Sequence, residues 1–307
     1  MSNIGVDHTS IANRLEAAKP SDRPVRAVLD TDTYNEVDDQ FALAYALLSP
    51  EDLSLEAIYA APFHNSRSDG PADGMEKSYD EIYRVLDLLG RQGRPVYRGS
   101  TSFLAHESRP VESDAAADLV RRATSSEGPL YVMAIGAITN VASALLLEPA
   151  IAERIVVVWL GGHAPVWPDN LEFNLRQDAA AARVVFDSGV PVIHIPCMPV
   201  ASHLITTVTE LEAYLVGKSR IGSYLTGIVR DYAENRFAWS KVIWDISAPA
   251  YLINPSWIES SLVTSPILTP DLRWEDSPGR HPMRRVHGVS RDGIFGDLFR
   301  KLAAAPE

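Results

Sequence analysis

The chain has 307 residues, of which 46% are hydrophobic and 22% are charged, as expected for a globular protein with a sizeable core. Its formal net charge of −12 argues against non-specific binding to nucleic acids or anionic membranes, but it is compatible with a neutral small-molecule ligand. The single cysteine, Cys197, excludes an intrachain disulfide and a cysteine zinc cluster, and together with the absence of a signal-like or membrane-length apolar segment it favours a cytoplasmic protein.

From residue 24 onward, apolar strands alternate with helical patterns. Residues 1–23 are polar and are predicted to form an N-terminal arm or a short helix. Strands are predicted at residues 25–30, 55–61, 95–98, 130–135, 155–160 and 191–196, where long apolar runs are typical of strands buried on both faces. Helices are predicted between them at residues 41–48, 76–89, 115–124, 140–147 and 178–188. This alternation predicts an α/β fold with an open, mostly parallel sheet and helices on both faces.

The last third of the chain has a different pattern. Residues 209–236 are predicted to be largely helical, residues 244–253 to form another helix and residues 262–268 a late strand. Four prolines then mark a loop-rich stretch before the final helix at residues 293–304. No segment resembles a flexible linker, so we expect a single domain over residues 1–307.

An acidic turn joins the first predicted strand to the first predicted helix. Half of the residues from position 30 to position 39 are acidic, namely Asp30, Asp32, Glu36, Asp38 and Asp39. So many carboxylates in one turn repel each other unless something positive joins them, and their oxygens suit Ca²⁺ or Mg²⁺. Alternatively, Asp38 or Asp39 caps the helix, but capping uses only one or two carboxylates. The turn is therefore predicted to be part of an active site.

Polar or glycine-rich groups also follow the other predicted strands. His64-Asn65, the segment 136–140 and the segment 161–163 each come shortly after a strand. Because the carboxyl ends of parallel strands meet at one edge of the sheet, we expect these groups to converge there with the acidic turn.

Two further candidates lie later in the chain. Asp245 enters an apolar helical run, where it is either a metal ligand or the N-cap of that helix. Glu172 and Asn174 offer a carboxylate and an amide that can hold a polyhydroxylated ligand, although the same residues also suit an ordinary solvated loop.

Taken in order, these segments resemble the signature of the inosine–uridine-preferring nucleoside hydrolase family over roughly residues 25–255. The matching segments are VLDTD at 28–32 followed by Asp38-Asp39, GAITNVA at 136–142, LGG at 160–162, EFN at 172–174 with Asp178 and Ala179-Ala180, and Trp244-Asp245.

The resemblance implies a Ca²⁺-dependent enzyme that splits a ribonucleoside into ribose and base. Carried over by position, Asp32 is the general base, and the metal ligands are Asp32, Asp39, Asp245 and the main-chain carbonyl of Ile135. The sugar-binding residues are Asp38, Asn65, Glu172 and Asn174 for the ribose hydroxyls, Asn170 for the 5′-hydroxyl, and Leu160 as lining of the sugar pocket. The expected partner is a small nucleoside or N-riboside rather than a nucleic acid or a membrane, and the chain is a candidate homo-oligomer.

Two departures from the family pattern bear on function. Five residues, 33–37, separate Asp32 from Asp38, which is a two-residue insertion without the usual Pro-Gly; Glu36 in this insertion either enters the site or, more simply, points to solvent. Trp244 stands where the family has a histidine that protonates the leaving base, and indole cannot do so. Trp244 therefore stacks on the leaving group, fills core space, or leaves acid catalysis to another residue; the candidates for that residue are His163, His64, Tyr232, Arg236 and Trp239.

Three alternatives to a nucleoside hydrolase stay open. One is a ribosidase with a different leaving group, and a second is a non-catalytic ribose- or nucleoside-binding protein. A third, a phosphatase-like use of the acidic turn, requires a cationic residue near the phosphate.

Overall fold

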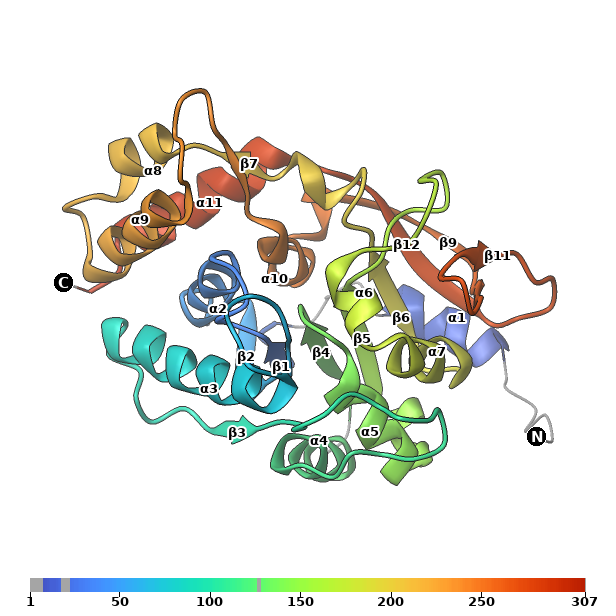
Figure 1. Cartoon of the computed structure of the whole chain (residues 1–307). Coiled ribbons are helices and arrows are strands. Elements are labelled where there is room, and N and C mark those ends of the chain that lie inside the picture. Colours follow the sequence, from blue (N-terminus) through green and yellow to red (C-terminus); the bar gives the residue numbers. More distant parts are fainter. Residues whose placement is uncertain (1–7, 18–22, 126–127, 307) are drawn as a thin grey trace.

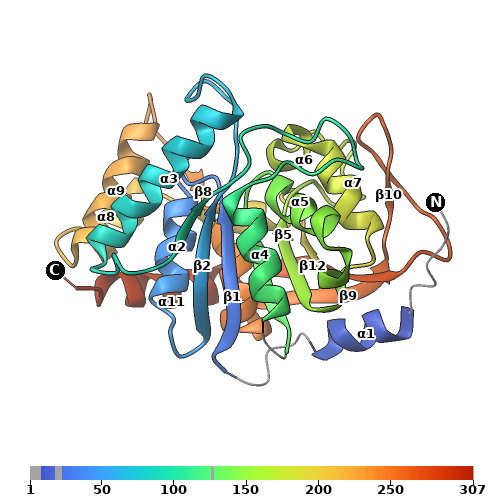
Figure 2. The same cartoon turned by 90° about the horizontal axis from the view of Figure 1, so that it is seen from below.

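The computed structural model describes residues 8–17, 23–125 and 128–306, arranged around a central sheet (Figures 1 and 2). The sheet has eight strands in the order β3-β2-β1-β4-β5-β6-β12-β9. Their bounds are β1 (Val25–Thr31), β2 (Leu53–Ala60), β3 (Val96–Arg98), β4 (Leu130–Ala134), β5 (Ile155–Leu160), β6 (Val192–Ile195), β9 (Ile258–Thr264) and β12 (Pro282–Val289). Neighbouring strands pair in parallel throughout, except for the antiparallel pair β12–β9 at one edge. The predicted open, mostly parallel sheet is confirmed.

Both faces of the sheet are covered by helices, and alternate strand residues face the two layers. In β1, Leu29 packs into one hydrophobic cluster and Val28 into the other; in β5, Val158 and Val157 divide in the same way. The first layer contains α1 (His8–Ala17), α2 (Asp39–Leu47), α3 (Pro71–Leu88), α8 (Val208–Leu215), α9 (Arg220–Tyr232), α10 (Ser247–Ile253) and α11 (Arg291–Ala303). The second contains α4 (Asp114–Thr124), α5 (Thr139–Leu147) and α7 (Ala179–Asp187), with α4 and α5 in front of the sheet in Figure 2.

All six predicted strands, and the five predicted helices between them, are present. Helix α3 begins five residues earlier than predicted, at Pro71, because proline suits the first turn of a helix, where its missing N–H has no intrahelical partner. The predicted helix over 209–236 is two helices: α8 ends before Gly217, whose φ of 70° breaks the helix, and Ser219 caps α9.

The C-terminal part contains the main error. Residues 282–289 were predicted as part of a loop-rich stretch, but they form β12, which pairs with both β6 and β9. Pro282 is the first residue of this strand, where proline is tolerated. The late strand begins at residue 258 instead of 262, and the segment from residue 244 starts as a 3-10 turn (Trp244–Ile246) before α10.

The remaining elements are short. Two small sheets pair β7 (Ile205–Thr206) with β8 (Lys241–Val242) and β10 (Ile267–Leu268) with β11 (Trp274–Glu275). The other short helices are α6 (Phe173–Gln177) and three further 3-10 turns, Pro149–Glu153, Ala201–His203 and Pro255–Trp257. Within the described ranges, no helix is both long and apolar enough to cross a membrane. Of the predicted arm, residues 1–7 and 18–22 lie outside the described residues, and the single-domain assignment stays a prediction.

Candidate active site

The acidic turn lies between the end of β1 and the start of α2. Asp38 occupies the N-cap position of α2 but makes no capping hydrogen bond with its side chain. Instead, the backbone N–H of Trp244 donates to Asp38 Oδ2 at 3.1 Å. Thr31 Oγ1 donates to Asp39 Oδ1 at 2.5 Å, which orients that carboxylate at the carboxyl end of the strand. Helix capping therefore does not explain Asp38.

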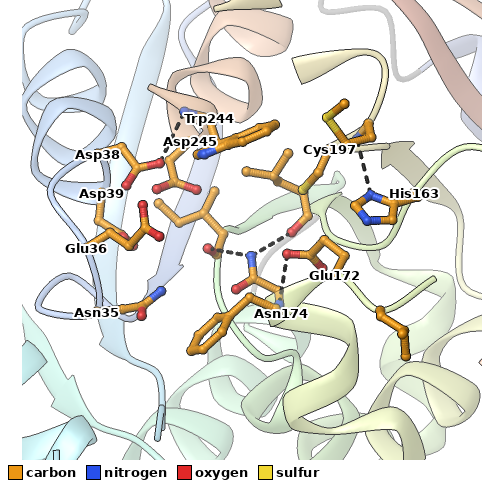
Figure 3. A pocket seen from close by; sticks show the side chains of 15 residues that line it. Asn35, Glu36, Asp38, Asp39, His163, Glu172, Asn174, Cys197, Trp244 and Asp245 are labelled. Atoms are coloured by element: carbon orange, nitrogen blue, oxygen red, sulfur yellow. Dashed lines mark hydrogen bonds between the residues drawn. The ribbon is translucent and has the colours of Figure 1, made fainter. Parts of the chain in front are cut away.

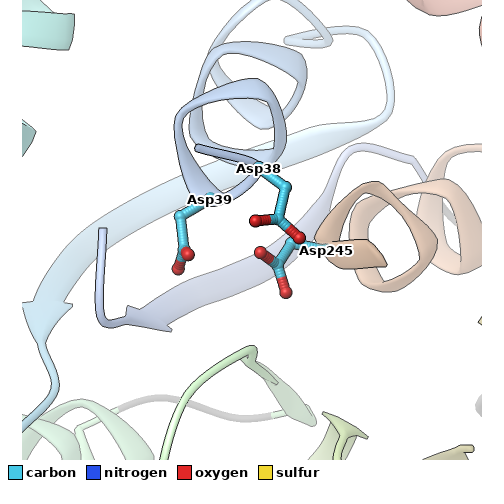
Figure 4. Close-up of side chains that lie close together, drawn as sticks. All are labelled: Asp38, Asp39 and Asp245. Carbon is cyan, nitrogen blue, oxygen red and sulfur yellow. The ribbon is translucent and has the colours of Figure 1, made fainter. Parts of the chain in front are cut away.

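Three carboxylates from distant parts of the chain meet beside this turn. Oxygens of Asp38, Asp39 and Asp245 lie within 4.8 Å of one another, and all three residues are buried (Figure 4). Asp245 comes from the 3-10 turn that precedes α10, about two hundred positions after the other two. These three residues, called the aspartate trio below, could hold a metal ion. Asp39 and Asp245 were predicted to share such an ion, whereas Asp38 was predicted only as a sugar ligand.

Asp32 lies next to the trio but outside it. Its side chain is 1% exposed, and within the described part of the chain neither carboxylate oxygen has a hydrogen-bond partner. Burial raises the pKa of Asp32 well above 3.8, and the nearby charge of Asp39 raises it further. A buried carboxylate without a donor is costly, so this position needs a proton, a cation or a polar ligand.

The other carboxylates of the cluster behave alike. Burial, followed by repulsion from Asp38, raises the pKa of Asp39 from 3.8 to about 7. The pKa values of Asp38 and Asp245 are also raised, in both cases mainly by burial. Four buried carboxylates that repel one another and include unpartnered oxygens are the arrangement that a hard divalent cation satisfies.

A pocket of about 320 Å³ opens beside the trio at the carboxyl edge of the sheet (Figure 3). Eight of the residues predicted for the site line it: Asp38, Asp39, Ile135, Leu160, Glu172, Asn174, Trp244 and Asp245. Of the groups expected to converge at this edge, the acidic turn and His163 line the pocket, whereas His64-Asn65 and residues 136–140 do not.

Glu172 and Asn174 are built into the pocket wall and do not belong to a solvated loop. Glu172 caps α6 and accepts hydrogen bonds from the backbone N–H groups of Asn174, Leu175 and Gly162 at 2.9, 2.9 and 2.7 Å. Asn174 Nδ2 donates to the carbonyl oxygens of Ile135 and Leu160, each at 3.1 Å. The carbonyl of Ile135 is therefore held at the pocket, and its second lone pair remains for a ligand.

Two predicted sugar-binding residues do not line the pocket. Asn65 lies behind the wall, where its Nδ2 donates to Asn35 Oδ1 at 2.6 Å, and it is Asn35 that reaches the pocket. Asn170 is buried, and its Oδ1 accepts a hydrogen bond from the backbone N–H of His163. That these two side chains meet the ligand stays a prediction, and Asn65 supports a residue that does line the pocket.

An ion pair beside the trio was missed. Glu36 lines the pocket, and Lys241 donates a hydrogen bond to it, so Glu36 does not simply point to solvent. Lys241 Nζ also lies 3.8 Å from Asp38 Oδ1, and its side chain is 8% exposed. A lone lysine four positions before Asp245, in an otherwise apolar run, was the available signal.

Replacing Lys241 by methionine should lower the free energy of unfolding by about 3 kcal/mol, because it leaves Asp38 without its neighbouring positive charge. Urea denaturation in the presence of a chelator measures this without interference from bound cations. Lys241→Arg keeps the positive charge and should therefore lower the free energy of unfolding by less than Lys241→Met does. Lys77→Met, which removes the exposed partner of Asp73, should leave the denaturation curve almost unchanged, and equal losses at both lysines would contradict this role for Lys241.

Trp244 borders the pocket and also packs against the hydrophobic core, as the core-filling interpretation expects; its stacking on a leaving group stays a prediction. Among the candidates for a proton donor, only His163 lines the pocket. Its Nδ1 accepts a hydrogen bond from the backbone N–H of Met198 at 3.3 Å, and burial lowers the pKa of its imidazole. Other lining residues without an earlier prediction are Leu171, Phe173, Cys197 and Met198.

The lack of a side chain at Gly136 leaves space for the carboxylate of Asp32. A Cβ at position 136 would lie 2.9 Å from Asp32 Cγ and Oδ1, so Gly136→Ala must displace the carboxylate. We expect this change to lower kcat by roughly tenfold to a hundredfold, as small misplacements of a reacting group do. Gly93→Ala is the matched control, because a Cβ there meets nothing within 4 Å. An active Gly136→Ala variant with wild-type kcat would show that the position of Asp32 is unimportant.

Comparisons with known proteins indicate a family for this chain. The family model described as inosine-uridine preferring nucleoside hydrolase matches residues 27–269. A probable uridine nucleosidase 2 from Arabidopsis thaliana is 26% identical over 264 residues, covering 78% of each chain. A pyrimidine-specific ribonucleoside hydrolase from Salmonella typhi is 28% identical over 230 residues, covering 66% of this chain and 69% of that protein.

Solved structures support the fold. A plant nucleoside hydrolase superposes with a TM-score of 0.74 at 19% identity, covering 92% of this chain and 99% of the other. A purine-preferring ribonucleoside hydrolase from Gardnerella vaginalis gives a TM-score of 0.72 at 21% identity, covering 91% and 98%. At these identities, the likeness concerns the fold alone.

Proposed function

The chain belongs to the inosine-uridine preferring nucleoside hydrolase family, and from this membership we propose that it is a Ca²⁺-dependent enzyme that hydrolyses a ribonucleoside or a related N-riboside to ribose and base. As a member of this family it is an N-glycosyl hydrolase. The observation that carries the finer proposal is the aspartate trio on the pocket wall, together with the unpartnered carboxylate of Asp32, which is close enough to Asp39 to feel its charge but is not itself a lining residue.

Ca²⁺ fits the donor set of this site. Asp32, Asp39, Asp245 and the carbonyl of Ile135 are oxygen donors, and Ca²⁺ takes six to eight such ligands in flexible geometry. Asp38 is close enough to join them. When bound, Ca²⁺ would supply Lewis acidity that makes a neighbouring water easier to deprotonate.

Side chains of the protein would supply the proton acceptor, stabilise the developing charge and orient the substrate. Asp32, with both oxygens unpartnered, would accept a proton from the attacking water as the C–O bond forms. The surrounding carboxylates would stabilise the positive charge that develops on the ribose. Asp38, Glu172 and Asn174 would orient the ribose hydroxyls, while Leu160 lines the sugar pocket.

The ribosidase with a different leaving group stays within this proposal, and Trp244 is the residue that favours it. A pure binding protein is disfavoured, because it would have no use for a buried, unpartnered carboxylate at position 32. A phosphatase-like reaction is also disfavoured, since no lysine or arginine is among the described residues that line the pocket.

The test is the release of reducing sugar from a panel of ribonucleosides with Ca²⁺ present. Turnover of at least one nucleoside, lost in the Asp32→Asn variant, is the expected result. Ribose binding without turnover of any substrate would instead support the binding protein. A cytoplasmic location and assembly into homo-oligomers complete the proposal, and they are tested by cell fractionation and by light scattering.

A further inference from the structure

The pocket wall carries far more negative than positive charge. Its five carboxylates are those of Glu36, Asp38, Asp39, Glu172 and Asp245. Within the described chain, no lining residue is a lysine or an arginine. The single charge of Lys241, behind the wall, and the two charges of a divalent cation would offset three of these five. The wall therefore stays negative and favours a ligand that brings positive charge of its own.

The indole of Trp244 borders the pocket beside the aspartate trio. The backbone N–H of Trp244 donates to Asp38, and Asp245 is the next residue, so Trp244 is tied directly to the aspartate trio (Figure 3). Its side chain borders the same pocket as the apolar side chains of Phe173 and Leu171. A group on the anomeric carbon of a ribose held at the trio would meet this aromatic wall. Indole is the strongest aromatic partner for a cation.

The described pocket wall lacks a ready acid for a leaving group. Apart from the five carboxylates, its titratable groups are His163 and Cys197. The backbone N–H of Met198 donates to His163 Nδ1, which opposes protonation of the imidazole, and burial lowers its pKa as well. The Cys197 thiol is buried beside Glu172, and burial raises its pKa well above 9.0, so it is a poor proton donor.

The five carboxylates of the wall already have other partners and are therefore poorly placed to donate a proton. Glu36 accepts a hydrogen bond from Lys241. Burial raises the pKa of Glu172, but both of its oxygens accept hydrogen bonds from backbone N–H groups, three in all, which oppose this rise and hold the carboxylate at the wall. The aspartate trio would be committed to the cation. A neutral nucleobase leaves as an anion unless it is protonated, so this pocket is poorly equipped to expel one.

A pyridinium leaving group suits the negative charge of the wall, and it does not need the proton donor that the wall lacks. When the bond between C1′ and the pyridinium nitrogen breaks, its electron pair passes to that nitrogen and cancels the positive charge. The water oxygen bonds to C1′, and one water proton passes to Asp32 and then to solvent. The products are ribose, a neutral pyridine and one proton, so the leaving group needs no acid.

Resting on the proposed function, we infer that the preferred substrate class of this enzyme is a cationic N-ribosylpyridinium, held between the negative wall and Trp244. Nicotinamide riboside is the probe of this class. Its 5′-phosphate derivative should be a poorer substrate, because the described wall offers no cationic side chain for a phosphate.

The first experiment compares kcat/KM for nicotinamide riboside, uridine and inosine with Ca²⁺ present. We expect nicotinamide riboside to exceed both nucleosides by at least about tenfold, a difference of about 1.4 kcal/mol. Reduced nicotinamide riboside, which is neutral but of similar shape, should be hydrolysed at least about tenfold more slowly than the cation. A 4-nitrophenyl riboside, which is neutral and also needs no acid, separates the effect of charge from the effect of the leaving group.

The second experiment tests the indole. Trp244→Leu should raise KM for nicotinamide riboside more than KM for uridine, whereas Trp244→Phe should retain part of the preference. Trp244 packs against the core, so a measurement that leaves it in place is also needed. Calorimetric binding of nicotinamide riboside and of its reduced form to the Asp32→Asn protein provides it. The cation is expected to bind more tightly than the reduced form.

Two negative results are distinguishable. Hydrolysis of uridine or inosine that depends on Asp32, with equal or lower kcat/KM for nicotinamide riboside, overturns the inference and leaves the proposed function standing. No hydrolysis of any riboside overturns both. Equal binding of the cation and its reduced form would likewise refute the role of charge.

Discussion

Replacing Asp32 by asparagine is expected to lower kcat by about 10³-fold, because the amide keeps the shape of the carboxylate but cannot accept the proton of the attacking water. Ribose release under saturating substrate and Ca²⁺ measures the loss. The same change removes a buried charge that has no hydrogen-bond partner among the described residues. The melting temperature measured in chelator should therefore not fall, and it should rise if the charge is costly there.

Asp30→Asn is the matched control for this variant. Asp30 lies two residues before Asp32, near the end of β1, and is similarly buried, and neither residue is among those that line the pocket. Unlike Asp32, Asp30 accepts a hydrogen bond from Asn140 Nδ2, at 2.8 Å. Burial raises its pKa to about 7, so it is already partly neutral at physiological pH, and asparagine resembles that form. Its kcat should stay close to wild type. A comparable loss in both variants would point to distortion of the strand, and an unchanged kcat in Asp32→Asn would exclude Asp32 as the base.

Removing divalent cations with a chelator is expected to abolish turnover and to make stability depend steeply on pH. Burial and mutual repulsion raise the folded-state pKa of Asp39 from 3.8 to about 7, and the pKa values of Asp32, Asp38 and Asp245 are raised as well. The unfolded chain therefore releases these protons at a lower pH than the folded protein does. Stability is greatest below about pH 4 with respect to these groups and is lost as the pH rises through about 7.

The measurement is a series of melting temperatures in chelator between about pH 5 and about pH 8, where a fall of several degrees is expected. Added Ca²⁺ should remove most of this fall, because it stabilises the charged carboxylates that the folded protein otherwise protonates. Asp245→Asn should flatten the pH dependence and weaken the stabilisation by Ca²⁺. A melting temperature that rises with pH in chelator, or that does not change when Ca²⁺ is added, would contradict a cation site at the aspartate trio.

Much of the fold follows from local patterns in the sequence. The central strands have apolar residues on both faces, and the structure buries Val28 and Leu29 in opposite layers, so both sides of each strand carried a signal. Strand β12 carried none of comparable strength. It begins at a proline and includes Arg284 and Arg285, and only pairing with β6 and β9, distant in sequence, makes it a strand.

The site was predictable to the extent that strand topology controls it. Asp39 belongs to the turn and helix start that follow β1. The rule that ligands bind at the carboxyl edge of a parallel sheet therefore predicted its location, and the structure brings Asp245 beside it. Asn65 lies five residues beyond the end of β2, which is far enough for the loop to turn its side chain toward Asn35. The pairing of Lys241 with Glu36 joins residues 205 positions apart, and no local pattern encodes such a contact.

The distance along the chain between the members of the aspartate trio has a consequence for synthesis of the protein. Asp245 leaves the ribosome 206 residues after Asp39, a delay of about 10 to 40 s at typical translation rates. For nearly all of that interval the nascent chain carries the acidic turn without Lys241, which lies four residues before Asp245, and throughout it lacks a complete set of ligands. Ion capture must therefore be a late event in biogenesis, and no N-terminal fragment ending before residue 245 can assemble the trio.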